Sequence, residues 1–419
     1  MRNEANQMQR PLEGLRVVDL TRALAGPYAT LLLAGLGAEV IKVEDPKGGD
    51  LARENSPYVG RDGLSVGRKY QDDLSVSHLT RSRGKRGVTL NLKHPEARKV
   101  FADLVRKSDI VVENFTSGTA ERLGVGYEDA RAANPSVIYC SLSGFGATIK
   151  GQEGSRAMDV LIQALSGAMY TSGAEDEPPV RIGLPIADVL TPIFAVVGIL
   201  AAVHHRVRTG QGQHVDVSML GALTSLVAVE NWAAMQAVGM LTRTGATLQR
   251  LCPFGLFECA DGYIALVAVQ DPLAHSLYRA MGQPEMVADP RFATRNARVA
   301  NATVLEERIL AWTRRHPMKE VIARLEAEDV PVAEVRHPQE ALADSRVVDR
   351  SETVVARHPS YEEGPELRTT GVPIVFSAAR TGFDPVFPTS IGEHNTDVFP
   401  RLLGYTDAEI ERLKQAGVI

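Results

Sequence analysis

The stretch Leu15–Glu44, LRVVDLTRALAGPYATLLLAGLGAEVIKVE, decides the fold. It opens with a short apolar run over Leu15–Leu20 and closes with another over Ala38–Glu44, both typical of buried strands. Between them Gly26-Pro27 indicates a turn, and a helix is expected from about Pro27, since proline is tolerated at the first helical position. Two strands joined by one helix form a βαβ unit, which predicts a parallel sheet.

The same alternation continues along the chain. VTLNLK (Val88–Lys93), DIVVENF (109–115) and VIYCSLSGFG (137–146) have the pattern of strands, and HPEARKVFADLVRKS (94–108) carries apolar residues at helical spacing. Strands alternating with helices predict an α/β layered domain.

The length of 419 residues predicts two domains. We expect residues 1–209 to form the N-terminal part of the large domain, with a polar surface excursion over Glu54–Leu79. Residues 210–239 are interpreted as a helical connector. Residues 240–320 form a smaller α+β domain, in which Asp261-Gly262 indicates a hairpin turn. Residues 321–419 return to the large domain.

Composition sets limits on partners and location. A net charge of −5 shows no basic excess, so nucleic acid is not an expected partner. The N-terminus has no apolar core of a secretory signal, and the apolar run Ile193–Val203 is about half of the roughly 20 residues that cross a bilayer. Cys140, Cys252 and Cys259 form no metal-binding spacing. A cytoplasmic protein with buried thiols, no metal and no membrane contact is expected.

A dinucleotide site is not expected. The close glycine pair near the start, Gly35 and Gly37, follows a helix and precedes a strand. The phosphate-binding fingerprint needs the reverse order and a third glycine, and the chain has no GxxxxGK[ST] motif.

Two carboxylates, Asp159 and Asp188, lie within Arg156–Thr191 beside small or apolar residues. Thr191 followed by Pro192 has the pattern of a helix start, which would leave Asp188 one turn upstream in a loop near the positive end of the helix dipole. There the carboxylate would stay ionised at neutral pH. A helix cap and a functional group are both open interpretations of Asp188.

A basic cluster precedes the second long helix. A solvated face and an anion site for a polyphosphate ligand both remain open interpretations of its members, which are Arg81, Arg83, Lys85, Arg86 and Lys93.

Several motifs in their order resemble the class III coenzyme A transferases, the CaiB/BaiF family, which includes formyl-CoA transferases. They span nearly the whole chain and include PLEGLRVVDLTRALAGP (11–27), RGKRGVTLNLKHPEAR (83–98), MDVLIQALSGAMYTSG (158–173), PPVRIGLPIAD (178–188) and IGEHNTDVF (391–399). The resemblance implies a Rossmann-like, CoA-binding large domain, a smaller α+β domain and an interlocked homodimer. It implies a coenzyme A thioester as substrate and no permanently bound cofactor.

The resemblance also assigns site residues. The nucleophilic aspartate falls on Asp188, with Asp159 as the second acidic position. Contacts to coenzyme A carry over by position to Leu24, Ala25, Leu90, Lys93, Asn114, Phe115, Arg122 and Arg156.

The expected activity is transfer of CoA from an acyl-CoA donor, succinyl-CoA among them, to a carboxylic acid through an aspartyl-CoA thioester. One alternative is a 2-methylacyl-CoA racemase of the same family. Those racemases carry a histidine directly before the first acid, where this chain has Met158, and loss of one acid/base group favours the transferase. The other alternative is a non-catalytic CoA-binding protein.

Overall fold

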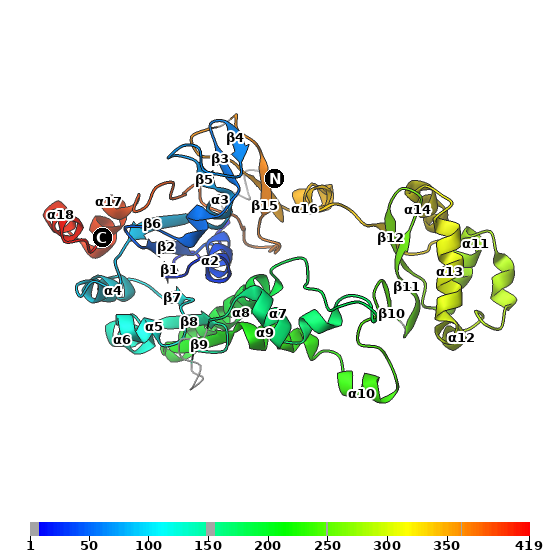
Figure 1. Ribbon diagram of the computed structural model, residues 1–419. Helices are drawn as coiled ribbons and strands as arrows, with labels where there is room; N and C mark the ends of the chain where they lie inside the picture. The colour runs from blue at the N-terminus through cyan, green and yellow to red at the C-terminus, as the bar shows by residue number, and fades with distance from the viewer. Residues whose placement is uncertain (1–7, 148–155, 249, 362) are drawn as a thin grey trace. The chain divides into compact units, whose positions relative to one another are not determined.

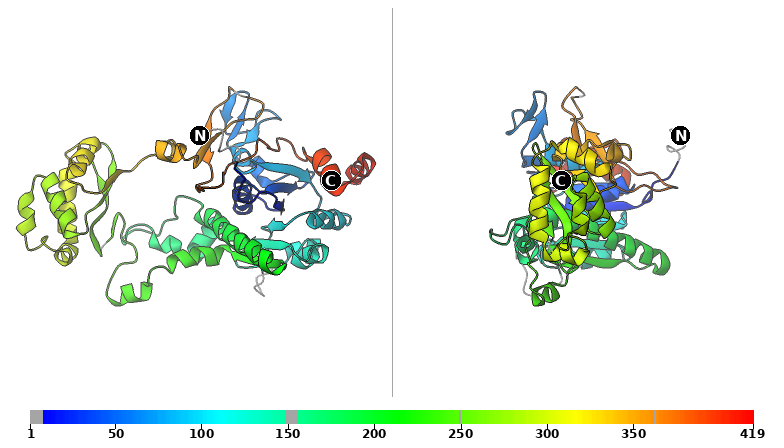
Figure 2. Two further views of the ribbon diagram at one scale, coloured as in Figure 1. Left: turned by 180° about the vertical axis from the view of Figure 1, so that it is seen from behind. Right: turned by 90° about the vertical axis from the view of Figure 1, so that its right-hand side faces the viewer.

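The computed structural model describes residues 8–147, 156–248, 250–361 and 363–419 (Figures 1 and 2). The chain forms two compact units. The first unit takes in the chain up to Ser166, Leu184–Leu226 and Leu342–Ile419, and the second takes in Gly167–Gly183 and Val227–Ala341. The segment predicted as the small domain, 240–320, lies inside the second unit, which extends beyond it at both ends and also includes the segment at 167–183.

The first unit is built on a six-stranded sheet in the order β6-β2-β1-β7-β8-β9, with every neighbouring pair parallel. Numbered along the chain, this is the 3-2-1-4-5-6 order of a doubly wound Rossmann fold. The predicted α/β, Rossmann-like large domain is confirmed. The strands are β1 (Arg16–Asp19), β2 (Glu39–Glu44), β6 (Lys85–Thr89), β7 (Ile110–Glu113), β8 (Ile138–Ser143) and β9 (Gln213–Ser218).

Alternate residues of the central strands pack on opposite faces of the sheet, as the two-residue period of a strand requires. Val17, Val40 and Ile110 belong to one core cluster, which also contains side chains of α2 (Ala25–Gly35) and α8 (Ile186–Thr209). Val18, Ile41 and Val111 belong to the other, with α4 (Ala97–Arg106) and α18 (Asp407–Gln415).

Helix α8 begins at Ile186, so the predicted helix start at Thr191-Pro192 is wrong. Its first turn is stabilised from another segment, because the carboxylate of Asp159 accepts the N–H of Ala187 at 2.8 Å. Thr191 is inside the helix, where its hydroxyl donates to the carbonyl of Ala187 at 2.7 Å. Pro192 is the seventh residue of the helix and cannot donate the hydrogen bond that would reach the carbonyl of Asp188.

At 24 residues α8 is longer than the apolar run that predicted it. Within the described ranges it is the one helix whose length and mean hydropathy of 2.3 would let it cross a membrane. Core helices of soluble proteins meet the same criterion, and the buried residues Ala195 and Ile199 belong to the core cluster beneath the sheet.

The segment expected to be a helical connector, 210–239, begins instead with a strand. Gln213–Ser218, QHVDVS, pairs with β8 as β9, and its alternating β-branched residues fit a sheet edge better than a helix. Helices α9 (Met219–Val227) and α10 (Trp232–Ala237) follow.

The excursion over Glu54–Leu79 forms a small antiparallel sheet of β3 (Tyr58–Gly60), β4 (Gly63–Ser65) and β5 (Leu74–Ser75). It is followed by α3 (Val76–Arg81) and packs through Val59 and Leu74 against Ala356 of β14 (Thr353–Ala356). Figure 1 shows this sheet beside β15 (Leu367–Thr370), which pairs with β14.

The second unit has a four-stranded antiparallel sheet, β10 (Thr247–Leu248), β11 (Leu251–Glu258), β12 (Tyr263–Val267) and β13 (Val332–Glu334). The Asp261-Gly262 turn joins β11 to β12, so the hairpin prediction is confirmed. The core contains Phe257, Ile264, Leu277 and Trp312. Its longer helices are α11 (Asp271–Ala280), α12 (Arg295–Ala300), α13 (Ala302–Thr313) and α14 (Met318–Glu326).

The remaining short elements connect these layers. They are α5 (Thr119–Leu123), α6 (Tyr127–Ala133), α7 (Asp159–Leu165), α15 (Pro338–Leu342), α16 (Ser345–Val348), α17 (Asn395–Val398) and four single turns at Leu51–Glu54, Ala168–Thr171, Pro284–Ala288 and Phe399–Leu403.

A buried charge cluster lies at the carboxyl end of β1 and β2. Asp19 and Lys85 are fully buried, and their carboxylate and ammonium lie 3.1 Å apart. Lys42 pairs with Asp50 at 2.8 Å. Burial alone would raise the pKa of Asp19, but the charges of Lys42 and Lys85 outweigh it and lower that pKa. Lys85, predicted in a solvated or anion-binding cluster, is therefore a core residue.

We expect Asp19→Ala to reduce the free energy of unfolding by about 3–5 kcal/mol, because it leaves two buried lysines without one of their carboxylates. Urea unfolding measures the change. Lys99→Ala, which removes an exposed pair with Asp103, is the control and should cost less than about 1 kcal/mol. Equal losses in the two variants would contradict the role of the cluster.

Candidate active site

A cavity of about 210 Å³ lies at the carboxyl ends of β1, β7 and β8, where the strand order of the sheet reverses. Ligands of open α/β sheets bind at this switch point. The cavity lies between the turn before α2, the ends of β7 and β8, the residues before α7, the first turn of α8 and the start of α9. Its lining residues are Ala23, Leu24, Ala25, Asn114–Ser117, Leu142–Gly146, Ala157, Met158, Asp188 and Met219.

Asp188 is the ionisable group that α8 contributes to this cavity. Burial, and after it the charge of Asp159, raise its pKa to about 6 against the opposing charge of Arg81. Desolvation, and not the helix dipole, therefore has the largest effect on the pKa of Asp188. A carboxylate with a raised pKa is more basic and more nucleophilic than one in water, and is still largely ionised at pH 7.

Asp159 has a different environment from Asp188. It is the first residue of α7, and both of its carboxylate oxygens accept hydrogen bonds. Oδ1 accepts the N–H of Ala187 at 2.8 Å, and Oδ2 accepts Nε2 of the buried Gln163 at 2.7 Å. Asp159 thus caps α8 and fixes the turn that carries Asp188.

Six of the eight residues assigned to coenzyme A line one of two cavities, and Leu90 and Arg156 line neither. Leu24, Ala25, Asn114 and Phe115 line the Asp188 cavity. Leu90 is a core residue with 1% of its surface exposed, and its N–H donates to the carbonyl of Glu44, so its side chain faces no ligand site.

Lys93 and Arg122 line a second cavity, of about 390 Å³, together with His94 and Arg98. Sequence reasoning missed His94 and Arg98, although both stand in the conspicuous run HPEAR after the third sheet strand. Arg156 is exposed at the start of a described segment, next to residues 148–155, which lie outside the described ranges.

Asn114 also has a structural task that its position in the sequence did not indicate. Its side-chain amide accepts the N–H of Arg22 at 2.8 Å and donates to the carbonyl of Arg22 at 2.9 Å. It therefore ties the end of β7 to the turn after β1.

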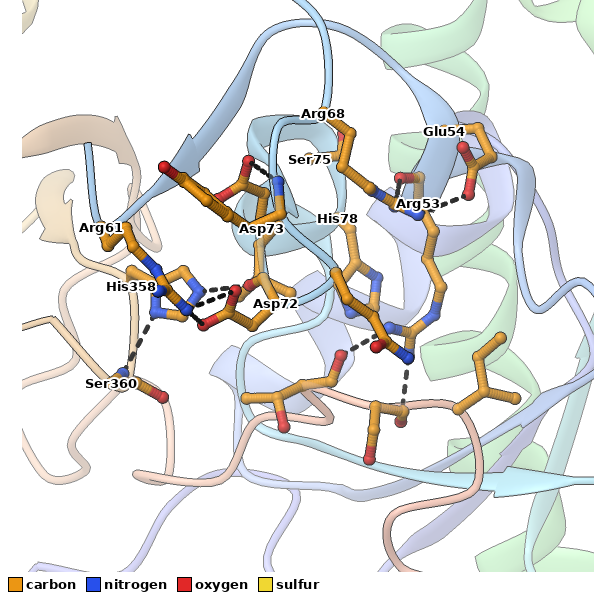
Figure 3. Close-up of a pocket in the computed structure, with 16 residues that line it drawn as sticks. Arg53, Glu54, Arg61, Arg68, Asp72, Asp73, Ser75, His78, His358 and Ser360 are labelled. Atoms are coloured by element: carbon orange, nitrogen blue, oxygen red, sulfur yellow. Dashed lines mark hydrogen bonds and ion pairs between the residues drawn. The ribbon is translucent and has the colours of Figure 1, made fainter. Parts of the chain in front are cut away.

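The excursion forms a third and larger cavity, of about 690 Å³ (Figure 3). Each of its arginines is paired with a carboxylate: Arg53 with Glu44 behind the wall at 2.7 Å, Arg61 with Asp72 at 3.4 Å, and Arg68 with Glu54 at 3.2 Å. Burial and the charge of Arg53 lower the pKa of His78 to about 4, so this imidazole is neutral. The wall is internally neutralised, and Asp188 is not part of it.

No group of three histidine, cysteine, aspartate or glutamate side chains in the described ranges is arranged to hold a metal ion. Cys140, Cys252 and Cys259 are buried and separate, and burial raises the pKa of the Cys140 thiol well above its ordinary value.

A half-buried carboxylate in a cavity at the switch point of a Rossmann-type sheet is the arrangement of an α/β enzyme site. Comparison with known proteins identifies the class. The sequence model of CoA-transferase family III matches residues 12–395. The chain belongs to CoA-transferase family III, and is a CoA-transferase.

Two relatives and one solved structure illustrate the match. The succinyl-CoA:mesaconate CoA-transferase of Haloarcula hispanica is 39% identical over 367 residues, which cover 87% of this chain and 89% of the relative. The succinyl-CoA–D-citramalate CoA-transferase of Chloroflexus aurantiacus is 34% identical over 412 residues, 98% of each chain. A CaiB/BaiF family protein of Brucella suis superimposes with a TM-score of 0.80 at 31% identity, over 94% of this chain and all of that one.

We expect Asp159→Asn to lower the pKa of Asp188 from about 6, because it removes a negative charge while asparagine still accepts the N–H of Ala187. The side-chain carbon signal of Asp188 can be titrated in 13C-aspartate-labelled protein and assigned by its absence in Asp188→Asn. Asp103→Asn, in α4 and outside the cavity lining, is the control. An unchanged titration in Asp159→Asn would show that Asp159 does not act on Asp188.

Proposed function

We propose that the protein transfers coenzyme A from succinyl-CoA to a dicarboxylic or hydroxydicarboxylic acid, with Asp188 as the covalent catalyst. The observation that carries the proposal is the half-buried Asp188 carboxylate, with its pKa raised to about 6, in a cavity lined by four of the expected coenzyme A contacts. The choice of donor and acceptor rests on the names of the two relatives, whose substrates are succinyl-CoA with mesaconate and with D-citramalate.

The first half-reaction releases the donor acid. A carboxylate oxygen of Asp188 attacks the thioester carbonyl, the carbon–sulfur bond breaks, and a mixed anhydride and CoA thiolate form. The thiolate then attacks the aspartyl carbonyl of the anhydride. Succinate leaves as a carboxylate and Asp188 carries CoA as a thioester.

The second half-reaction runs the same steps in reverse. The acceptor carboxylate attacks the aspartyl thioester and expels the thiolate, which then attacks the acceptor carbonyl of the new anhydride. The product thioester leaves and Asp188 is a free carboxylate again. No proton is gained or lost overall, so the enzyme needs an ionised nucleophile and a site that keeps water from the anhydride.

Asp159 supports this chemistry indirectly, because both of its carboxylate oxygens already accept hydrogen bonds from the protein. Its two hydrogen bonds hold the first turn of α8, and its charge makes Asp188 more basic. A more basic carboxylate is a better nucleophile at the thioester carbon.

We expect hydroxylamine added with succinyl-CoA to modify Asp188, because it cleaves the aspartyl thioester to a hydroxamate that peptide mass spectrometry detects. Asp188→Asn should lose transfer by at least about 10⁴-fold, as is usual when a covalent nucleophile is removed. Wild-type transfer rates in Asp188→Asn would contradict the proposal. Exchange of the α-proton of a 2-methylacyl-CoA in deuterated water would instead indicate the racemase, and thioester binding without transfer to any acid would indicate a binding protein.

The second cavity suits the phosphorylated end of coenzyme A. Lys93, Arg98 and Arg122 present three cations there, and arginine and lysine neutralise phosphate through charge-assisted hydrogen bonds. Gly124 contributes space, since a side chain at that position would lie against the guanidinium of Arg98. The thioester end of coenzyme A would then lie against Leu24, Ala25, Asn114 and Phe115. Leu90 would contact coenzyme A through its backbone only, and Arg156 would contact it from outside the two cavities.

We expect Arg122→Ala to raise the KM for succinyl-CoA about tenfold with little change in kcat, because it weakens a charge-assisted contact that the ground and transition states share. With succinyl-3′-dephospho-CoA the wild type and the variant should have similar KM values. Arg131→Ala, an exposed arginine of α6 paired with Glu128, is the control. A tenfold loss that persists with the dephospho substrate would place the 3′-phosphate elsewhere.

The protein is further proposed to be a cytoplasmic homodimer with interlocked chains, without nucleic-acid or membrane partners. An apolar surface on α7 and α8 supports the dimer, because exposed apolar patches mark interaction sites. It comprises Val160, Leu161, Leu165, Ile193, Phe194 and Val197, each more than 40% exposed.

A further inference from the structure

The turn that joins β1 to α2, Thr21–Ala23, has every backbone polar group hydrogen-bonded to a side chain from elsewhere or from β1. The N–H of Thr21 donates to Asp19 at 2.9 Å, and its carbonyl accepts the ammonium of Lys42. Asn114 holds both groups of Arg22. The remaining two groups belong to Ala23.

Ala23 adopts a left-handed backbone conformation, with φ of 65°, that non-glycine residues seldom occupy. Its N–H donates to Asp50 at 2.9 Å, and its carbonyl accepts Nη1 of Arg81 at 2.9 Å. Asp50 is itself fixed by Lys42 at 2.8 Å and by the N–H of Ala52 at 2.9 Å. The strained residue is therefore held from both sides by charged groups.

Arg81 is the last residue of α3 and is half-buried. Besides its contact with Ala23, its positive charge acts on Asp188 and lowers the pKa of that carboxyl against burial and the charge of Asp159. Ala23 and Asp188 line the same cavity. One guanidinium thus acts on both the backbone wall of the cavity and the group that would react in it.

We propose that Arg81 is a positioning residue of the transferase site, which holds the Ala23 turn in place and sets a positive charge beside Asp188. This inference rests on the proposed function of Asp188. Helix α3, at the end of the excursion, therefore has a role in the site. Its sequence does not indicate this role, and Arg81 is not among the residues that line the cavity.

The test compares Arg81→Gln, which removes the charge, with Arg81→Lys, which keeps it. Arg86→Gln is the matched control, since Arg86 follows in the same segment but pairs with Glu39 and Asp397. Three measurements are made on each variant: hydrogen exchange of the peptide that contains Thr21–Ala23, the titration of Asp188 by 13C-aspartate NMR, and kcat and KM for succinyl-CoA. The first two do not depend on activity, so they remain informative if the proposed reaction is wrong.

For Arg81→Gln we expect faster exchange of the Thr21–Ala23 peptide, a higher pKa for Asp188, and kcat/KM lower by about tenfold, the usual effect of losing a charge-assisted hydrogen bond. Because transfer needs ionised Asp188, the acid limb of kcat/KM should move to higher pH in Arg81→Gln and stay in place in Arg81→Lys. Arg86→Gln should match the wild type in all three measurements.

Exchange and titration in Arg81→Gln that coincide with the wild type would overturn the inference. A loss of activity with neither change would do the same, since it would assign Arg81 to substrate contact. If the two physical changes occur while Asp188→Asn still transfers CoA, Arg81 positions Asp188 as inferred and the proposed function fails on its own.

Discussion

The ion pairs of Asp19, Lys42, Asp50 and Lys85 are the interaction on which the site depends. Two lysines and two aspartates beneath the switch point are almost fully buried, and each charge is stable only with its partners in place. The cluster joins β1, β2 and β6 to the turn before η1 (Leu51–Glu54), and from it Asp19, Lys42 and Asp50 reach the backbone of Thr21–Ala23. The shape of the cavity wall is therefore set by buried electrostatics rather than by local turn sequence.

Asp188 and Asp159, the two aspartates singled out in the sequence, have different roles at the start of α8, which forms the opposite wall of the cavity. Asp188 lines the cavity, and burial together with a neighbouring negative charge keeps its pKa high. Both carboxylate oxygens of Asp159 accept hydrogen bonds, one from Ala187 and one from Gln163, so Asp159 stabilises the start of α8. A like-charged neighbour that is itself fixed by hydrogen bonds is a simple way to make one carboxylate more basic than the other.

Much of the fold could be predicted because it rests on local pattern. The sequence shows clear apolar runs for β1, β2, β7 and β8 and a helical period for α4. The family motifs singled out Asp188. The start of α8 could not be predicted in this way. Thr191-Pro192 is a good local start, but the cap comes from Asp159, 28 residues before Ala187, and only tertiary structure brings them together. Strand β9 was missed because an edge strand with few apolar residues has a weak pattern.

Charges were the least predictable feature of the site. Lys85, Arg86 and Lys93 look alike in sequence, yet one is a core residue, one is a surface ion pair and one lines a basic cavity. The pKa of Asp188 depends on depth and on Arg81, which is 107 positions away in the chain, so no local pattern could give it. The resemblance assigned Leu90 to coenzyme A by sequence position alone. Its side chain is buried in the core, so position did not indicate that it is exposed to a ligand.

The fully hydrogen-bonded turn after β1 also distinguishes this sheet from a nicotinamide enzyme with the same strand order. In those enzymes the corresponding turn leaves its N–H groups pointing outward to bind a pyrophosphate. Here the N–H groups of Thr21, Arg22 and Ala23 are already bound to Asp19, Asn114 and Asp50, two of them by carboxylates that would repel an approaching phosphate. In this chain the turn instead presents to the cavity a backbone whose polar groups are already bonded to the protein, a surface that suits an uncharged group better than a diphosphate.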